Sequence, residues 1–317
     1  MASVIADPWL LPAALAVEAC IGYPQAVYAR IAHPVVWIGR LIEYLERRWN
    51  VGTHSDPALR VYGIITVAII VGLAALAGYL LQRLAIAIPF GMAIIILAAT
   101  TGLAQRALYD HVNDVLRPLL AGDLAAARIA VGRIVGRDTA ALGESDVAAA
   151  ALESLAESFN DGIVAPAFWL LLGGLPGLFA YKAINTADSL IGHLEPRWRM
   201  FGWAAARSDD AVNLVPARIA GVLLVIAGGG GLRVMWRDAS KHPSPNAGWP
   251  EAAMAGSLKI HLGGPSRYDG LWHGRPTFGV GIEAQPRHLR KGLLIYIRAC
   301  VLSWLAALAV PAVALLS

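Results

Sequence analysis

Three long apolar segments, 62–81, 84–103 and 292–316, constrain the fold of this chain more than any other feature. Each has the ~20 mostly apolar residues that a helix needs to cross the hydrocarbon core of a bilayer. A hydrophobic share of 57% and a mean hydropathy of +0.57 exceed what a soluble core has to bury. The sequence therefore predicts an all-α polytopic membrane protein with about four transmembrane helices.

Three further apolar stretches leave the exact number of spans open. The stretch 9–29 is apolar except for Glu18, and we expect it to be the fourth span, although an acid at membrane depth is costly. The stretches 163–180 and 217–232 are interrupted by glycine and proline. Broken backbone is tolerated in a membrane only against protein or water, so both are predicted to be broken or re-entrant.

The distribution of positive charge bears on these two stretches. The segments 104–160 and 233–291 are both rich in Arg and Lys, and short loops with this composition lie on the cytoplasmic side of a membrane. A single crossing between them would separate them, so both broken stretches cross or neither does. We favour the second arrangement, with the polar segments on one cytoplasmic face. The 26 basic residues form no patch with interleaved aromatics, so no nucleic-acid partner is expected.

The polar segments belong to what we expect to be a single integral membrane domain, residues 1–317. The segment 104–160 is predicted to be a soluble helical insertion, in which Asp123 caps one helix and Ser145 begins another. The segment 233–291 is predicted to be loop-rich, and loops of this length are usually functional or disordered. No strand-like alternation is present.

A polar run that follows the predicted insertion is the first candidate site. By the 3.6-residue period, Glu153, Glu157, Asn160 and Asp161 share one face of a helix. Two carboxylates four residues apart repel each other by about 0.2–0.5 kcal/mol, so a cation or a substrate is expected to compensate them. The alternative interpretation is a solvated acidic face.

Two more polar runs lie beside the interrupted stretches: Lys182, Asn185 and Asp188, and then Arg207, Asp209, Asp210 and Asn213. A lysine at the membrane interface is the structural alternative for Lys182. The two consecutive aspartates suit Mg²⁺, which favours one or two carboxylates together with substrate phosphates. Capping of a helix N-terminus is the structural alternative for the aspartates.

Two outlying runs complete the candidates. His33 and Arg40 lie in the first, and Asn246 and Glu251 lie in a turn-rich second one. A lone histidine such as His33 is more often structural than catalytic. The chain has no Walker A loop, no Gly-x-Ser-x-Gly elbow and no Cys/His spacing typical of zinc.

Taken together, the motifs resemble one known family, the CobD/CbiB family of cobalamin biosynthesis, named adenosylcobinamide-phosphate synthase. The similarity is carried in family order by the segments 153–168, 181–188, 201–218 and 244–254. The chain departs from the family at four places: Ser158 stands where the family usually has Asn, Tyr23 where it usually has Asp, His193 where Tyr is common and Ala187 where Leu is common. These departures bear on substrate preference more than on the reaction class.

The resemblance implies a multi-pass ligase of the cell inner membrane. Such an enzyme joins the carboxylate of adenosylcobyric acid to the amine of (R)-1-amino-2-propanol O-phosphate, or of aminopropanol, with ATP and Mg²⁺. The corrinoid, the amine and the lipid bilayer are then the expected partners. Other corrinoid-pathway enzymes or a second copy of the chain are further candidates, and the active face is expected to be cytoplasmic.

This chemistry suggests a role for each candidate residue. ATP supplies a leaving group as an acyl phosphate, which the amine then attacks, and catalysis of phosphoryl transfer is mostly positioning and charge neutralisation. For the catalytic and metal roles, Asp209, Asp210 and Asp161 are assigned to Mg²⁺, Lys182 and Arg207 to phosphate oxygens, and Glu153 or Glu157 to the base. For substrate binding, the candidates are His33, Arg40, Asn160, Asn185, Asp188, Arg207, Asn213, Asn246 and Glu251.

Three alternative functions stay open at this point. An intramembrane phosphotransferase or prenyltransferase also uses Asp clusters and Mg²⁺, but the motif that begins at Asp161 lacks its later aspartates. A corrinoid transporter is expected to show two matching halves, and the sequence has no such symmetry. A scaffold for corrinoid enzymes would bind corrinoid without turnover.

Overall fold

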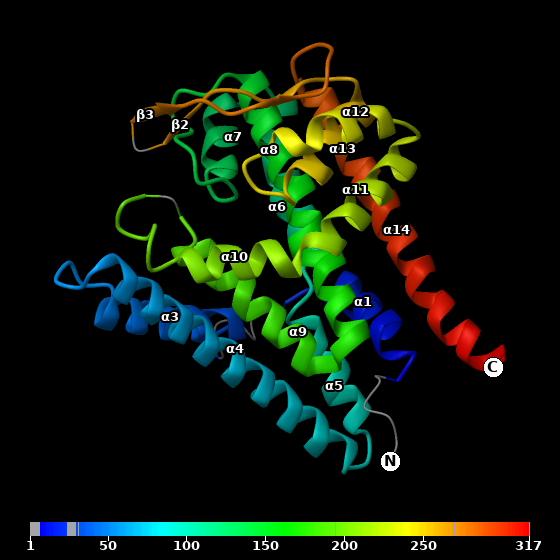
Figure 1. Cartoon of the computed structure of the whole chain (residues 1–317). Helices are drawn as coiled ribbons and strands as arrows, with labels where there is room; N and C mark the ends of the chain where they lie inside the picture. The colour runs from blue at the N-terminus through cyan, green and yellow to red at the C-terminus, as the bar shows by residue number, and fades with distance from the viewer. Residues whose placement is uncertain (1–6, 24–29, 31, 194, 269, 317) are drawn as a thin grey trace. The chain divides into compact units, whose positions relative to one another are not determined.

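The computed structural model describes residues 7–23, 30, 32–193, 195–268 and 270–316, and these are mainly helical (Figure 1). Among them, four helical segments are long and apolar enough to cross a membrane: Asp56–Ile86, Gly91–Leu120, Glu144–Ile191 and Pro286–Val313. A fifth candidate is the bent pair Trp203–Val212 and Leu214–Gly228. The predicted class, an all-α polytopic membrane protein, is confirmed.

Two of the predicted spans have different bounds in the structure. The predicted span 84–103 is interrupted near Pro89, because Phe90 adopts a left-handed backbone with φ of 60°, and the helix restarts at Gly91. Within 9–29, the helix α1 covers Leu10–Ile21, which at 12 residues is too short to span, and residues 24–29 lie outside the described part. The stretch 163–180 lies inside a long candidate span.

The chain forms two compact units, which are described separately here. The first comprises residues 1–104, 165–213 and 310–317, and the second comprises residues 105–164 and 214–309. The first unit holds α1, α3 (Pro34–Trp49), α4 (Asp56–Ile86), α5 (Gly91–Thr100), α9 (Ala165–Ile191) and α10 (Trp203–Val212). The expected single membrane domain of residues 1–317 stays a prediction.

A break in α9 is the main irregularity of the first unit. Gly174 has φ of 60° in the middle of the helix, and Pro176 follows it. The backbone N–H of Leu175 donates to Oε1 of Gln82 on α4 at 2.9 Å, and both groups are buried. This is the broken backbone that the glycines and prolines of 163–180 predicted, with its freed donor bonded by a neighbouring helix.

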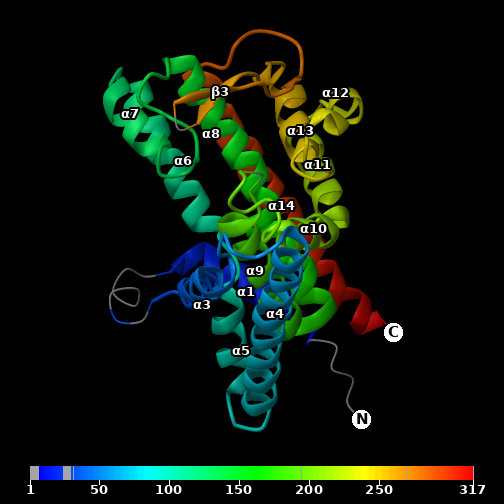
Figure 2. The ribbon, with the colours of Figure 1, turned by 60° about the vertical axis from the view of Figure 1, so that its left-hand side comes forward.

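The helices α4 and α9 lie side by side in both views (Figures 1 and 2). Their approach depends on Gly78, where an added Cβ would lie 2.7 Å from the backbone carbonyl of Leu175. At a second glycine of α4, Gly63, an added Cβ would collide with the backbone carbonyl oxygen of Phe201. Small residues of this kind let the backbones of membrane helices approach closely.

The second unit holds α6 (Gln105–Leu120), α7 (Leu124–Val131), α8 (Glu144–Phe159), the π-helical η1 (Asn160–Val164), α11 (Leu214–Gly228), α12 (Leu232–Asp238), the 3₁₀ turn η2 (Ala239–Lys241), α13 (Gly248–Leu258) and most of α14 (Pro286–Leu316). A core of small and aliphatic side chains from α6, α8, α11, α13 and α14 fills it. As predicted, the Asp123 carboxylate caps α7, since it accepts from the backbone N–H of Ala126 at 2.9 Å.

The predicted start of α8 and the predicted lack of strands need correction. Helix α8 begins one residue before Ser145, at Glu144, because the Asp146 carboxylate accepts from the backbone N–H of Gly143. Four short strands occur where only loops were expected: β1 (Leu262–Gly263), β2 (Ser266–Tyr268), β3 (Leu271–His273) and β4 (Thr277–Phe278). They pair antiparallel as β1 with β4 and β2 with β3. Strands of two or three residues are too short to show an alternating pattern.

We expect Gly78→Ala to destabilise the protein in detergent. The new Cβ meets backbone, which cannot move aside as a flexible side chain would, and such overpacking costs about 1–3 kcal/mol of unfolding free energy. Thermal unfolding measures the effect. Gly72→Ala on the same helix is the control, because an added Cβ there meets nothing within 4 Å. Equal melting temperatures for the two variants would contradict the packing described.

Candidate functional site

The structure divides the predicted site residues between the two units. The first unit holds His33, Arg40, Lys182, Asn185, Asp188, Arg207, Asp209, Asp210 and Asn213, and the second holds Glu153, Glu157, Asn160, Asp161, Asn246 and Glu251. Within each unit, several of these side chains lie close together.

Glu153 is the centre of a buried ionic cluster in the second unit. Its carboxylate, 4% exposed, pairs with the guanidinium of Arg137, and Nη1 of Arg275 lies 3.1 Å from Oε2. Its other oxygen, Oε1, accepts from the backbone N–H of Gly263 at 2.8 Å. Helix α8 supplies the carboxylate, whereas both arginines come from loops. Two cations and a backbone donor thus surround this carboxylate, and both of its oxygens have partners.

Glu251, in the first turn of α13, lies beside this cluster but is less well paired than Glu153. Its side chain is 1% exposed, and Oε2 has no hydrogen-bond partner among the described residues. The nearest cation, Nη2 of Arg275, is 4.0 Å away. Burial, and after it the carboxylates of Glu153 and Glu157, raise the pKa of Glu251 well above its usual value. A buried carboxyl with a raised pKa holds a proton more readily than an exposed one, which makes it a candidate for proton transfer.

His242 lies next to the second oxygen of Glu251. Its Nε2 is 3.8 Å from Oε1, and its Nδ1 accepts from the backbone N–H of Ser244 at 2.9 Å. An accepting Nδ1 in a neutral ring places the ring proton on Nε2, the nitrogen that faces Glu251. Burial, and after it the Arg275 guanidinium, lower the pKa of His242 below its usual value, which favours that neutral form.

The other predicted residues of the second unit have distinct surroundings. Glu157 is exposed, one turn after Glu153 on α8. Nδ2 of Asn160 donates to Oδ1 of Asp161 at 2.7 Å within the π-helical turn. The Asn246 side chain is buried, and its Oδ1 accepts from the guanidinium of Arg218 at 3.4 Å.

In the first unit, α9 and α10 present a chain of hydrogen-bonded polar side chains. Nζ of Lys182 donates to Oδ1 of Asn185 at 3.2 Å, and Nδ2 of Asn185 lies 3.5 Å from Oδ1 of Asp209. The other Asp209 oxygen accepts from Asn213 at 2.9 Å, and Asn213 accepts from the hydroxyl of Tyr181 at 3.2 Å. These residues come from two of the predicted runs, which the fold brings together.

The remaining residues of the first unit lie around this chain or apart from it. Arg207 pairs with Asp210 at 3.2 Å, one turn apart on α10. Arg40 of α3 lines a polar hollow of about 530 Å³ together with Lys182 and Asn185. Asp188 lies on α9, one turn before Gly192, and does not line this hollow.

Two structural alternatives from the sequence are resolved by the helix bounds. Asp209 and Asp210 lie in the last turn of α10, so the pair does not cap a helix N-terminus. His33 does act as a cap, because its Nδ1 accepts from the backbone N–H of Val35 at the start of α3. Burial, and then the Lys182 ammonium, lower the pKa of His33.

The donor set for Mg²⁺ in the first unit consists of the two adjacent carboxylates. Asp209 is oriented by two side-chain amides, and Asp210 is held by Arg207. No group of three or more His, Cys, Asp or Glu side chains with metal-site geometry is present in the described part of the chain. Mg²⁺ is commonly held by one or two carboxylates plus substrate phosphates, so this pair fits the ion. Asp161, the third predicted ligand, belongs to the second unit.

Comparison with known proteins assigns the family. The family model described as CobD/Cbib protein matches residues 11–296. The chain belongs to the CobD/CbiB family. It is 45% identical to the cobalamin biosynthesis protein CobD of Rhodobacter capsulatus over 294 residues, which cover 92% of this chain and 93% of that protein. It is 42% identical to CobD of a Sinorhizobium species, with coverage of 92% and 94%. No solved structure matches the chain significantly.

Membership of the CobD/CbiB family places the chain in cobalamin biosynthesis, and its substrates are therefore corrinoid compounds. The family resemblance seen in the motifs is confirmed. The coverage of more than nine-tenths of both relatives shows that the shared region includes both units.

Three residues of the ionic cluster were missed by the sequence analysis, namely Arg137, His242 and Arg275. Arg137 lies between Gly136 and Asp138 in a stretch without a recognisable motif. His242 and Arg275 lie in the Gly- and Pro-rich segment whose length already marked it as a candidate functional loop. Charged residues next to glycine or proline in that segment are the sequence signal that could have indicated these two residues.

We expect Glu153→Gln to lower the stability of the protein. The change leaves Arg137 and Arg275 buried without their anion, and breaking a buried ion pair in this way costs about 3–5 kcal/mol of unfolding free energy. Thermal unfolding in detergent measures it. Glu144→Gln, an exposed position on the same helix, is the control and should leave the melting temperature unchanged. A stable Glu153→Gln protein would mean that the arginines do not depend on this carboxylate.

Proposed function

We propose that the chain is an ATP-dependent ligase that forms an amide bond, an adenosylcobinamide-phosphate synthase. It would join adenosylcobyric acid to (R)-1-amino-2-propanol O-phosphate, or to aminopropanol, at the cytoplasmic face of the cell inner membrane. Family membership and a set of candidate membrane spans support the pathway and the membrane setting. The observation that carries the reaction class is Glu251, a buried carboxyl with a raised pKa, whose Oε2 accepts no hydrogen bond from the described residues and lies 4.0 Å from Arg275.

The proposed reaction has two steps. First, a carboxylate oxygen of the corrinoid attacks the γ-phosphorus of ATP, which forms an acyl phosphate and releases ADP. The amine nitrogen then attacks the acyl carbon, the C–N bond forms, and the bond from carbon to the phosphate oxygen breaks. The proton that the nitrogen loses has to be accepted by a base, and phosphate leaves.

Glu251 fits the role of that base better than Glu153 or Glu157. Both oxygens of Glu153 are already bonded, to two arginines and to a backbone N–H, and Glu157 is exposed. Glu251 has an oxygen free to receive a proton, and burial raises its affinity for one. His242 faces its other oxygen and would hold the carboxylate in place. Glu157 would contribute by raising the pKa of Glu251.

The first unit would bind the phosphates. Asp209 and Asp210 are proposed to hold Mg²⁺, which when bound supplies positive charge to the phosphate oxygens. Arg207 is proposed to contact phosphate oxygens of the nucleotide, and Lys182, which lines the separate polar hollow, is proposed to contact a phosphate group there. Asn185 and Asn213 orient Asp209 and are proposed to contact substrate amides. The buried Asn160 and Asn246 of the second unit are proposed separately as substrate contacts. Asp161 as a third metal ligand, and His33, Arg40 and Asp188 as substrate contacts, stay predictions.

The reaction is tested by incubating the detergent-purified full chain with adenosylcobyric acid, the amine and MgATP. We expect a corrinoid whose mass rises by that of the amine minus water, with one ADP for each product. The phosphorylated and free amines are assayed separately. An unchanged corrinoid mass with both amines would contradict the proposal and favour a binding or transport role.

Glu251→Gln should lower kcat by about 10²–10⁴-fold, since the amide cannot accept the proton. Turnover of the wild type should increase with pH as Glu251 loses its proton, over a range well above the usual pKa of a glutamate. Glu283→Gln, at an exposed position, is the matched control. If Glu251→Gln turns over at the wild-type rate with the same pH profile, Glu251 is not the base.

Asp209→Asn should raise the Mg²⁺ concentration needed for half-maximal turnover by about 10-fold, because loss of an oriented ligand charge weakens metal affinity. Binding of Mn²⁺ in the presence of ATP, followed by electron paramagnetic resonance, gives a second readout. Asp114→Asn, exposed on α6, is the control. An unchanged metal requirement in Asp209→Asn would move the metal site away from α10.

A further inference from the structure

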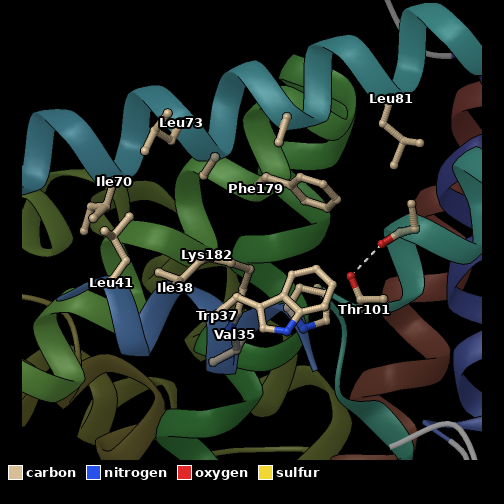
Figure 3. Close-up of a pocket in the computed structure, with 15 residues that line it drawn as sticks. Val35, Trp37, Ile38, Leu41, Ile70, Leu73, Leu81, Thr101, Phe179 and Lys182 are labelled. Carbon is tan, nitrogen blue, oxygen red and sulfur yellow. Dashed lines mark hydrogen bonds between the residues drawn. The ribbon is translucent and has the colours of Figure 1, made fainter. Parts of the chain in front are cut away.

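An apolar cavity of about 470 Å³ lies within the first unit, between α3, α4, α5 and α9 (Figure 3). Figure 3 shows Leu73 from α4, Phe179 from α9 and Trp37 from α3 around one space, with Lys182 beside them. The volume lies in the range of ~300–1,000 Å³ that is typical of small-molecule sites. Among the described residues that line this cavity, Lys182 carries the single charge.

Lys182 also lines the neighbouring polar hollow. That hollow, of about 530 Å³, shares Val35 and Lys182 with the apolar cavity, and its further polar lining residues are Arg40, Glu43, Asn185, Thr186 and Ser189. A molecule that occupied both spaces would be apolar at one end and hydrogen-bonding at the other. The two cations, Arg40 and Lys182, outnumber the one anion, Glu43, which pairs with Arg47 outside the hollow at 3.7 Å, so the net positive charge favours an anionic group at the polar end.

The helices around the cavity indicate its depth in a membrane. Helix α4 is a candidate span, whereas α3 is amphipathic. Trp37, Ile38 and Leu41 of α3 line the apolar cavity, and Arg40 faces the polar hollow. A helix with one apolar and one charged side is typical of the boundary between lipid headgroups and acyl chains. The cavity therefore lies where a spanning helix meets a helix suited to the membrane surface.

We propose that this cavity binds one acyl chain of an anionic phospholipid, whose phosphate contacts Lys182 and Arg40. The apolar walls match the chain, and the two cations at the boundary match the phosphate. An apolar helix of another protein would fill the cavity but bring no anion to Lys182. The proposal rests on the part of the proposed function that places Lys182 on a phosphate oxygen, and it names a lipid as the source of that phosphate.

The residues proposed to bind the nucleotide differ from those proposed to bind the lipid. Asp209, Asp210 and Arg207 of α10 do not line the apolar cavity or the polar hollow. The bound phospholipid thus acts as a fixed part of the first unit, which ties α3 to α4 and α9 at the membrane surface.

The test is native mass spectrometry of the full chain, purified in mild detergent and supplied with dioleoyl phosphatidylglycerol. Ala77→Trp places a large ring in the cavity, because Ala77 lines it and is exposed. We expect bound phosphatidylglycerol to fall by about tenfold or more, since displacing even two buried methylenes costs that much affinity. Leu76→Trp, the preceding residue on α4, does not line the cavity and should keep the lipid.

Two further experiments test whether the lipid phosphate contacts Lys182 and whether a free phosphate could take its place. Lys182→Met keeps an unbranched side chain without its charge, and we expect it to abolish the preference for phosphatidylglycerol over diacylglycerol. Inorganic phosphate at millimolar concentration should not release the lipid from the wild type. Complete release by inorganic phosphate would show an anion site without an acyl-chain site, and would overturn the proposal.

Two more results would overturn it: equal lipid in Ala77→Trp and the wild type, or equal loss in Ala77→Trp and Leu76→Trp. If Ala77→Trp does not fold, Ala98→Leu on α5 fills the same cavity and replaces it. Lipid counts and amide formation are separate readouts. A wild type that binds lipid and makes no amide contradicts the proposed function, whereas one that makes amide but fails the lipid arms contradicts this inference.

Discussion

A backbone donor or acceptor at membrane depth has no water to bond, and the first unit is arranged around that constraint. Helix α9 breaks at Gly174, which frees the backbone N–H of Leu175 from its place in a regular helix. Gln82 of α4 bonds that donor, and Gly78 one turn earlier lets the two backbones come close enough for the bond to form. The position of the polar side chains further along α9, from Tyr181 to Asn185, follows from this fixed contact.

In the second unit, the corresponding constraint is the burial of charged carboxylates. Burying Glu153 and Glu251 together would be very costly without Arg137 and Arg275, because each buried carboxylate loses its hydration. Both arginines pair with Glu153, whereas Glu251 lies 4.0 Å from Nη2 of Arg275. The two neighbouring carboxyls therefore differ in their partners, and burial raises the pKa of Glu251. Environment can in this way assign different roles to the same side chain.

Several parts of the fold and the site could be predicted from the sequence. Long apolar runs identified the membrane class because hydropathy alone separates spans from soluble helices, and Asp123 was recognisable as a cap from its position. The break in α9 was visible in its glycines and prolines. The interruption between α4 and α5 could not be predicted, because the left-handed backbone of Phe90 does not change the hydropathy of the sequence. The pairing of Arg137 and Arg275 with Glu153 joins residues 16 and 122 positions apart, and no local pattern encodes such contacts.

The π-helical turn at Asn160–Val164 has a consequence for insertions and deletions. A regular α-helix that loses one residue rotates the parts on either side of the loss by about 100° relative to each other. A π turn already holds one residue more than an α turn, so the loss of one residue there restores α-helical geometry and preserves the phase of the helix. In the second unit, this turn is therefore where a single-residue deletion would least disturb the direction in which α8 presents Glu153.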